Sequence, residues 1–241
     1  MLYLLFGVSV GVAIFVMYRC TSVGERRPRR GAARDAEFVR SIAGALRIPL
    51  SEARQMLVEA EATTPTEIAP RLYLGNAASA RNRAALRARG VTHVLNATAS
   101  LPNSFERERA FAYCRAPVDD TLQADLRGHF DLAAAFIGAA LRGGGGCLVH
   151  CQQGVSRSAA LVIAYLMRAE GLDFDDAFAR VRARRFIHPN ENFVRQLRAL
   201  DERLARARGG GGGGDDDGPP ARARRRGGGP ASPEAVNHAR S

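Results

Sequence analysis

An apolar strand that runs directly into a turn and then into an apolar helix constrains this 241-residue chain more than any other feature. The strand ends at Cys151, the turn contains Gly154, and Arg157 opens the helix. Such a turn lets backbone N–H groups converge on one point, where the helix dipole adds positive potential and an arginine fork can hold two oxygens. The stretch therefore predicts a binding site for a tetrahedral oxyanion such as phosphate. The residues predicted to bind it are Gln152, Gln153, Gly154, Val155, Ser156 and Arg157.

The same local field acts on the thiol of Cys151. A helix N-terminus and a nearby cation stabilise thiolate over thiol, so we expect the pKa of Cys151 to fall from about 8.5 to roughly 3.5 to 7.5. Cys151 would then be a nucleophile at neutral pH. The alternative interpretation is a buried structural cysteine in an ordinary strand-to-helix turn.

The pattern His-Cys-x-x-Gly-x-Ser-Arg-Ser of residues 150–158 resembles the phosphate loop of the cysteine-dependent protein phosphatases, and within them the dual-specificity branch. Residues 71–75, 94–96 and 187–193 also resemble recurrent stretches of that branch. The resemblance spans about residues 65–207, and the chain looks like an atypical member of the dual-specificity family. It implies a phosphatase that needs no metal and no cofactor.

The order of predicted elements points to the same fold. Strands are expected at 71–75, 91–96, 111–118 and 147–150, and helices at 77–89, 126–141 and from 159, 174 and 193 onwards. Strands that alternate with helices predict an α/β fold with a central, mostly parallel twisted sheet flanked by helices. The ligand of such a sheet sits beyond the carboxyl ends of the strands, which is where Cys151 falls.

Cleavage of a phosphate ester requires a proton for the leaving oxygen. The loop before the 126–141 helix offers Asp119 and Asp120, and the resemblance places the general acid at Asp120. The alternative is that both aspartates cap that helix, although Asp125 is better placed for capping. The resemblance also implies that Ser158 eases the departure of the Cys151 thiolate from a phosphocysteine intermediate.

Two further residues are candidates for supporting roles beside Cys151. His150 is predicted to orient the loop, with a merely buried histidine as the alternative. Cys114 is the candidate partner for a disulfide that would trap oxidised Cys151. Cys147 is less suitable, because four residues along one strand separate it from Cys151 by about 13 Å. The five histidines have no metal-ligand spacing.

Residues 1–18 are almost uninterruptedly apolar, and residues 19–34 form a basic linker with several arginines. A run of this length can just cross a thin bilayer. Arginines on its C-terminal side alone predict a membrane anchor with the catalytic domain in the cytosol. Gly7 and Gly11 would let two such helices form a weak homodimer. The alternative is a cytoplasmic protein whose first residues pack on its own domain.

The remaining segments differ in composition. Residues 35–63 contain two short helical patterns and are predicted to be a spacer, or a flap on the main domain. Residues 64–207 form the predicted dual-specificity phosphatase domain. Residues 208–241 are rich in Gly, Asp and Arg, and we expect them to be disordered. The net charge of +11 lies mostly outside the predicted core and supports no nucleic-acid partner.

The resemblance leaves three functions open: a protein phosphatase for phosphotyrosine and phosphoserine or phosphothreonine, a membrane-attached phosphoinositide phosphatase, and a non-catalytic phosphoprotein-binding module. Basic residues in place of Gln152 and Gln153 would suggest phosphoinositides, so the neutral pair favours a phosphoprotein substrate. Because Cys151, Arg157 and Asp120 are all present, the binding module is disfavoured.

Overall fold

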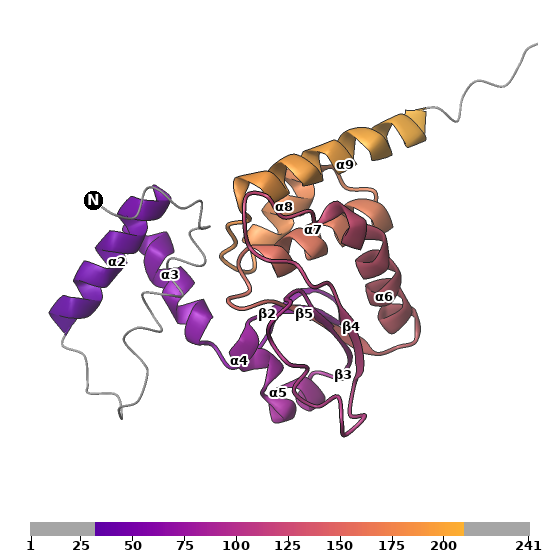
Figure 1. Cartoon of the computed structure of the whole chain (residues 1–241), viewed down its shortest axis with the longest axis horizontal. Helices are drawn as coiled ribbons and strands as arrows, with labels where there is room; N and C mark the ends of the chain where they lie inside the picture. The colour runs from indigo at the N-terminus through magenta and orange to yellow at the C-terminus, as the bar shows by residue number, and fades with distance from the viewer. Residues whose placement is uncertain (1–31, 210–241) are drawn as a thin grey trace, which may run out of the picture.

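The computed structural model describes residues 32–209 and contains one five-stranded sheet (Figure 1). Its strands are β1 (Thr66–Ala69), β2 (Leu72–Gly75), β3 (Val91–Asn96), β4 (Ala112–Arg115) and β5 (Gly146–His150). They lie in the order β1-β2-β5-β3-β4. β1 runs antiparallel to β2, and all other pairs are parallel. The predicted α/β fold with a mostly parallel sheet is confirmed, and β5 is its central strand.

Helices cover both faces of this sheet (Figure 1). They are α4 (Ala77–Ala80), α5 (Arg83–Ala88), α6 (Phe130–Arg142), α7 (Arg157–Ala169), α8 (Phe174–Arg182) and α9 (Glu191–Gly209), with a 3-10 turn at Arg127–His129. Alternate side chains of a strand point to opposite faces. Leu148 of β5 accordingly packs with Leu86 of α5, whereas Val149 packs with Ile163 of α7.

The structure differs from the expected elements at three places. The helix expected over 77–89 is split into α4 and α5, because the Asn82 side chain accepts a hydrogen bond from Ala85 N and caps a new helix. The strand expected over 111–118 is shorter, because Val118 N donates to Ala116 O and turns the chain out of the ladder. The short edge strand β1 was not predicted.

Two helices, α2 (Ala32–Leu46) and α3 (Leu50–Glu61), precede the sheet. They pack against one another and against two side chains of the main domain, Val155 and Phe186. The shared apolar cluster also contains Val39, Ile42, Ala43, Ala53 and Met56. We call α2 and α3 together the N-terminal hairpin.

The predicted anchor at 1–18, with Gly7 and Gly11, lies outside the described residues. The same is true of the tail beyond Gly209, where α9 ends. No helix within residues 32–209 is long and apolar enough to cross a membrane.

Candidate active site

The loop of residues 151–156, here called the phosphate loop, joins β5 to α7 at the carboxyl end of the parallel strands. Gly154 has φ +72°, in the left-handed region that favours glycine. A Cβ at this position would lie 2.4 Å from the carbonyl oxygen of Gly75 in β2. The tight turn therefore requires glycine at position 154, as the sequence motif indicated.

Backbone donors outside the phosphate loop hold two of its carbonyl groups, those of Gln152 and Val155. Gln152 O accepts from Ala77 N at 3.1 Å, at the start of α4. Val155 O accepts from His188 N at 2.9 Å, in the segment before α9. These two bonds turn the carbonyls away from the centre of the loop.

The carbonyls between them are held by one buried side chain, Arg185. Its Nη2 donates to Gln153 O at 3.1 Å and its Nε to Gly154 O at 3.0 Å. With the carbonyls turned outward, most loop amides have no acceptor among residues 32–209. The unbonded amides are those of Gln152, Gln153, Val155 and Ser156. Successive loop N–H groups without an acceptor in the protein can bind an anion together, so this arrangement supports an anion site.

Cys151 is only 2% exposed, and its sulfur contacts the backbone of the same loop. Its Sγ accepts from Gly154 N at 3.3 Å and from Ser158 Oγ at 3.1 Å. Burial raises the pKa of the thiol, but the Arg157 guanidinium and the Ser158 hydrogen bonds outweigh burial, so the pKa is lowered. The surroundings of the sulfur therefore favour the thiolate over the thiol, which is the direction that the sequence predicts, and the role of Cys151 as nucleophile stays a prediction.

Arg157, on the first turn of α7, uses one part of its guanidinium for a hydrogen bond within the protein and leaves another part without one. Its Nη1 donates to Val118 O at 3.0 Å. Its Nε is buried and has no hydrogen-bond partner among the described residues, with the nearest carboxylate oxygen, of Asp120, 3.6 Å away. This free donor suits an oxygen of a bound phosphate.

Asp120 and Asp119 have different environments. Asp119 is exposed, whereas Asp120 is 7% exposed and lies beside the loop. Oδ1 of Asp120 accepts from Ser156 Oγ at 2.9 Å and from Asn190 Nδ2 at 2.8 Å. Of the two aspartates only Asp120 is placed to reach a bound ester, although its role as general acid stays a prediction. Asp125 accepts from Arg127 N at 2.9 Å, but it caps neither the 3-10 turn nor α6, because the N-cap residues are Leu126 and His129 and neither helix start has a side-chain cap.

Asn190 also contributes to the site, although the sequence motif of residues 187–193 predicted no role for it. Its backbone N donates to Ser156 Oγ at 3.2 Å, and its Oδ1 accepts from Phe193 N at 3.0 Å. Asn190 thereby links the start of α9 to both Asp120 and the loop. An Asn directly before a helical pattern is a capping signal, and this signal was available in the sequence.

His150 is buried at the end of β5, and its Nδ1 lies 3.3 Å from Cys151 O. Burial lowers the pKa of His150 to about 4, against a smaller raising effect of that hydrogen bond. A neutral imidazole therefore donates Nδ1–H to the carbonyl of Cys151, which is compatible with the predicted orienting role.

Cys114 lies on β4, two strands away from β5. Its register partner is Leu95, which in turn pairs with Val149. Two strand spacings amount to about 10 Å, beyond the Cα separation of about 7 Å that a disulfide tolerates. A disulfide between Cys114 and Cys151 would therefore need backbone movement, and the redox pairing stays a prediction. Within residues 32–209, no three His, Cys, Asp or Glu side chains gather in a way that could hold a metal ion.

A buried cysteine of lowered pKa, an array of loop amides and an arginine with a free donor define the class of cysteine-dependent phosphatases. Residues 72–203 match the dual specificity phosphatase catalytic domain. The chain belongs to this family of phosphoric monoester hydrolases, which confirms the resemblance noted in the sequence.

Two curated relatives show how far the similarity extends. Human dual specificity protein phosphatase 26 is 46% identical over 143 residues, which cover 57% of this chain and 67% of the relative. Dual specificity protein phosphatase 1-B of Xenopus laevis is 44% identical over 134 residues, 55% of this chain and 36% of the relative. The matched part thus spans little more than a third of the Xenopus protein.

Among solved structures, a mouse putative dual specificity phosphatase complexed with zinc tungstate has a TM-score of 0.58 and 38% identity. The match covers 63% of this chain and 94% of the mouse chain.

Proposed function

We propose that this chain hydrolyses phosphotyrosine and phosphoserine or phosphothreonine in proteins, through a phosphocysteine intermediate at Cys151. The observation that carries the proposal is the sulfur of Cys151, which accepts from Gly154 N and Ser158 Oγ beside Arg157. A thiolate held in this way is a nucleophile aimed at whatever anion the loop binds.

In the first step the Cys151 thiolate attacks phosphorus in line. The S–P bond forms while the P–O bond to the substrate breaks, and Asp120 gives its proton to the departing oxygen. The loop amides and Arg157 hold the equatorial oxygens, where negative charge develops.

In the second step water attacks the phosphocysteine. Asp120, now a carboxylate, takes a proton from that water, and the S–P bond breaks to release inorganic phosphate and the thiolate. The Ser158 hydroxyl, 3.1 Å from the sulfur, stabilises the thiolate as it leaves. The side chains return to their starting protonation states.

Protein substrates are favoured over phosphoinositides by the loop and by the relatives. Gln152 and Gln153 place no positive charge at positions where a polyphosphorylated headgroup would need one. Both curated relatives reported above are named as protein phosphatases. A phosphoprotein is therefore the proposed substrate class.

The test compares three substrates with the full-length protein and its Cys151→Ser variant. We expect wild-type turnover of phosphotyrosine and phosphothreonine peptides, little turnover of phosphoinositides, and no turnover by Cys151→Ser, which should still bind the peptides. Turnover of phosphoinositides alone would favour a lipid phosphatase. Peptide binding without turnover by the wild type would favour a binding module.

A further inference from the structure

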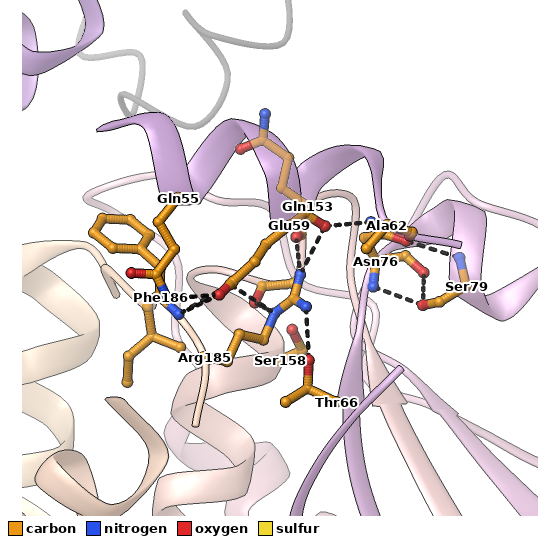
Figure 2. Close-up of polar contacts among 12 residues, drawn as sticks. Gln55, Glu59, Ala62, Thr66, Asn76, Ser79, Gln153, Ser158, Arg185 and Phe186 are labelled. Atoms are coloured by element: carbon orange, nitrogen blue, oxygen red, sulfur yellow. Dashed lines mark hydrogen bonds and ion pairs between the residues drawn. The ribbon is translucent and has the colours of Figure 1, made fainter. Parts of the chain in front are cut away.

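Arg185 lies between α3 and the phosphate loop, where its guanidinium is 1% exposed (Figure 2). Nε and Nη2 hold the carbonyls of Gly154 and Gln153, and Nη1 donates to Thr66 Oγ1 at 3.2 Å. One guanidinium thus fixes two consecutive peptide groups of the loop. The direction of the adjoining loop amides depends on those peptide planes.

A buried guanidinium is costly unless a negative charge accompanies it. The carboxylate of Glu59, near the end of α3, supplies that charge, with Oε2 3.7 Å from Arg185 Nε. Burial lowers the pKa of Arg185, while Glu59 and the Cys151 thiolate raise it. These two groups are the negative charges that act on Arg185.

Glu59 also fixes the residue that follows Arg185. Phe186 N donates to both of its carboxylate oxygens, at 3.1 Å and 2.9 Å. Gln55, one turn earlier in α3, donates to Glu59 Oε1 at 2.9 Å and holds the carboxylate in place (Figure 2). The Phe186 ring in turn packs with Val155, the one apolar side chain among loop residues 152–156.

We propose that Glu59 is a positioning residue of the active site, which acts through Arg185 and Phe186 to keep the amides of the phosphate loop turned toward the bound phosphate. The proposal rests on the phosphatase function proposed above. Glu59 lies outside residues 72–203, which match the family. The catalytic unit of this chain therefore extends into the N-terminal hairpin.

Electrostatics and positioning predict opposite effects for Glu59→Gln, which keeps the side-chain shape and removes its charge. Loss of a negative charge would by itself tighten the binding of an anion and make the Cys151 thiolate easier to form. If Glu59 no longer held Arg185 and Phe186, the loop amides would point in different directions. Anion binding would then weaken, and the Cys151 thiolate would be harder to form. The sign of the change therefore separates the two effects.

The experiment measures tungstate affinity by calorimetry and the pH dependence of Cys151 alkylation by iodoacetamide, on the full-length protein. Neither readout requires turnover, so failure of this proposal is distinguishable from failure of the phosphatase function. We expect Glu59→Gln to weaken tungstate binding by about tenfold or more, the scale of one lost charge-assisted hydrogen bond. Alkylation should shift to higher pH.

The matched control is Glu52→Gln, on the same helix. Glu52 pairs with Arg182 Nη2 at 2.6 Å and fastens the hairpin to the domain without touching the loop carbonyls. We expect its tungstate affinity to stay within about twofold of wild type, since Glu52 contacts no group of the loop and a partly exposed ion pair contributes little. If Glu59→Gln does not fold, Glu59→Asp is used in its place, because it keeps the charge but shortens the side chain. The same weakening of tungstate binding is expected. Unchanged or tighter tungstate binding by the Glu59 variant, or an equal loss in Glu52→Gln, would overturn the proposal.

Discussion

The hydroxyl of Ser158 lies 3.1 Å from the sulfur of Cys151, and both groups are buried. Because Ser158 is on the first turn of α7, the helix that orients the loop also carries the group that stabilises the thiolate. This contact lowers the pKa of the thiol. In the proposed mechanism it also assists the sulfur as a leaving group in the second step.

Ser158→Ala should therefore slow the second chemical step more than the first. A hydrogen bond to a charged group contributes about 1.5–3 kcal/mol, so we expect kcat to fall roughly 10- to 100-fold. Rapid mixing with para-nitrophenyl phosphate should then show a burst of nitrophenol equal to the enzyme concentration. A kcat close to that of wild type, without a burst, would contradict this role of Ser158.

Asp120→Asn should lower kcat for a phosphotyrosine peptide by about 10²- to 10⁴-fold and leave KM within a few-fold, because the proposed general acid acts in bond cleavage and not in substrate binding. The loss should be smaller with para-nitrophenyl phosphate, whose leaving group needs less protonation. Asp119→Asn is the matched control, since Asp119 is exposed and should change kcat little. If the two variants behave in the reverse order, Asp119 is the acid.

The chemistry around Cys151 could be predicted from sequence because its parts are neighbours in the chain. Residues 150–158 contain the nucleophile, the turn glycine, the arginine and the serine, so one motif determines their relative positions. Asp120 lies in another loop, and only the resemblance to a family singled it out. The contacts of Arg185 with the loop carbonyls and with Glu59 could not be predicted, because Arg185 and Glu59 are 126 residues apart.

Helix and strand propensity also gave a wrong prediction where a single polar side chain determines the backbone conformation. Asn82 interrupts a stretch of residues that otherwise favour a helix, and the predicted helix over 77–89 included it as an interior residue. β1 has only one buried residue, Ile68, which gives too little alternation to predict a strand.

The lowered pKa of His150 predicts that the folded protein loses stability in mild acid. Its pKa is about 4 in the folded protein, below the usual value of about 6.5, so the unfolded chain binds the proton more readily. Stability contributed by the neutral imidazole is fully present above about pH 6.5 and is lost as the pH falls toward 4. Between pH 7 and pH 5 the expected loss is about 2 kcal/mol.

Urea unfolding at pH 7 and pH 5 measures this loss, and His150→Asn provides the comparison. The Asn amide can still donate to Cys151 O but does not titrate. We expect the free energy of unfolding of the variant to fall less between the two pH values, by about 2 kcal/mol. Equal pH dependence of the two proteins would show that His150 does not carry the effect.

Membrane attachment through residues 1–18 stays a prediction, and it needs a test that does not depend on glycosylation. The triplet Asn96-Ala97-Thr98 fits a glycosylation signal, yet Asn96 is fully buried. Its Nδ2 donates to Leu101 O and its Oδ1 accepts from Thr98. The folded domain thus hides the Asn96 amide from modification, so protease protection is used here as the readout of topology.

Carbonate extraction combined with protease protection in cells gives the answer. We expect full-length protein in the membrane pellet with its catalytic domain accessible to protease from the cytosolic side, because the arginines follow the apolar run. Val10→Arg should release the protein, since a central arginine costs about 2.5–3.5 kcal/mol on insertion, whereas Val10→Leu should not. Release of the wild type by carbonate would reject the anchor, and a protease-protected catalytic domain would reverse its orientation.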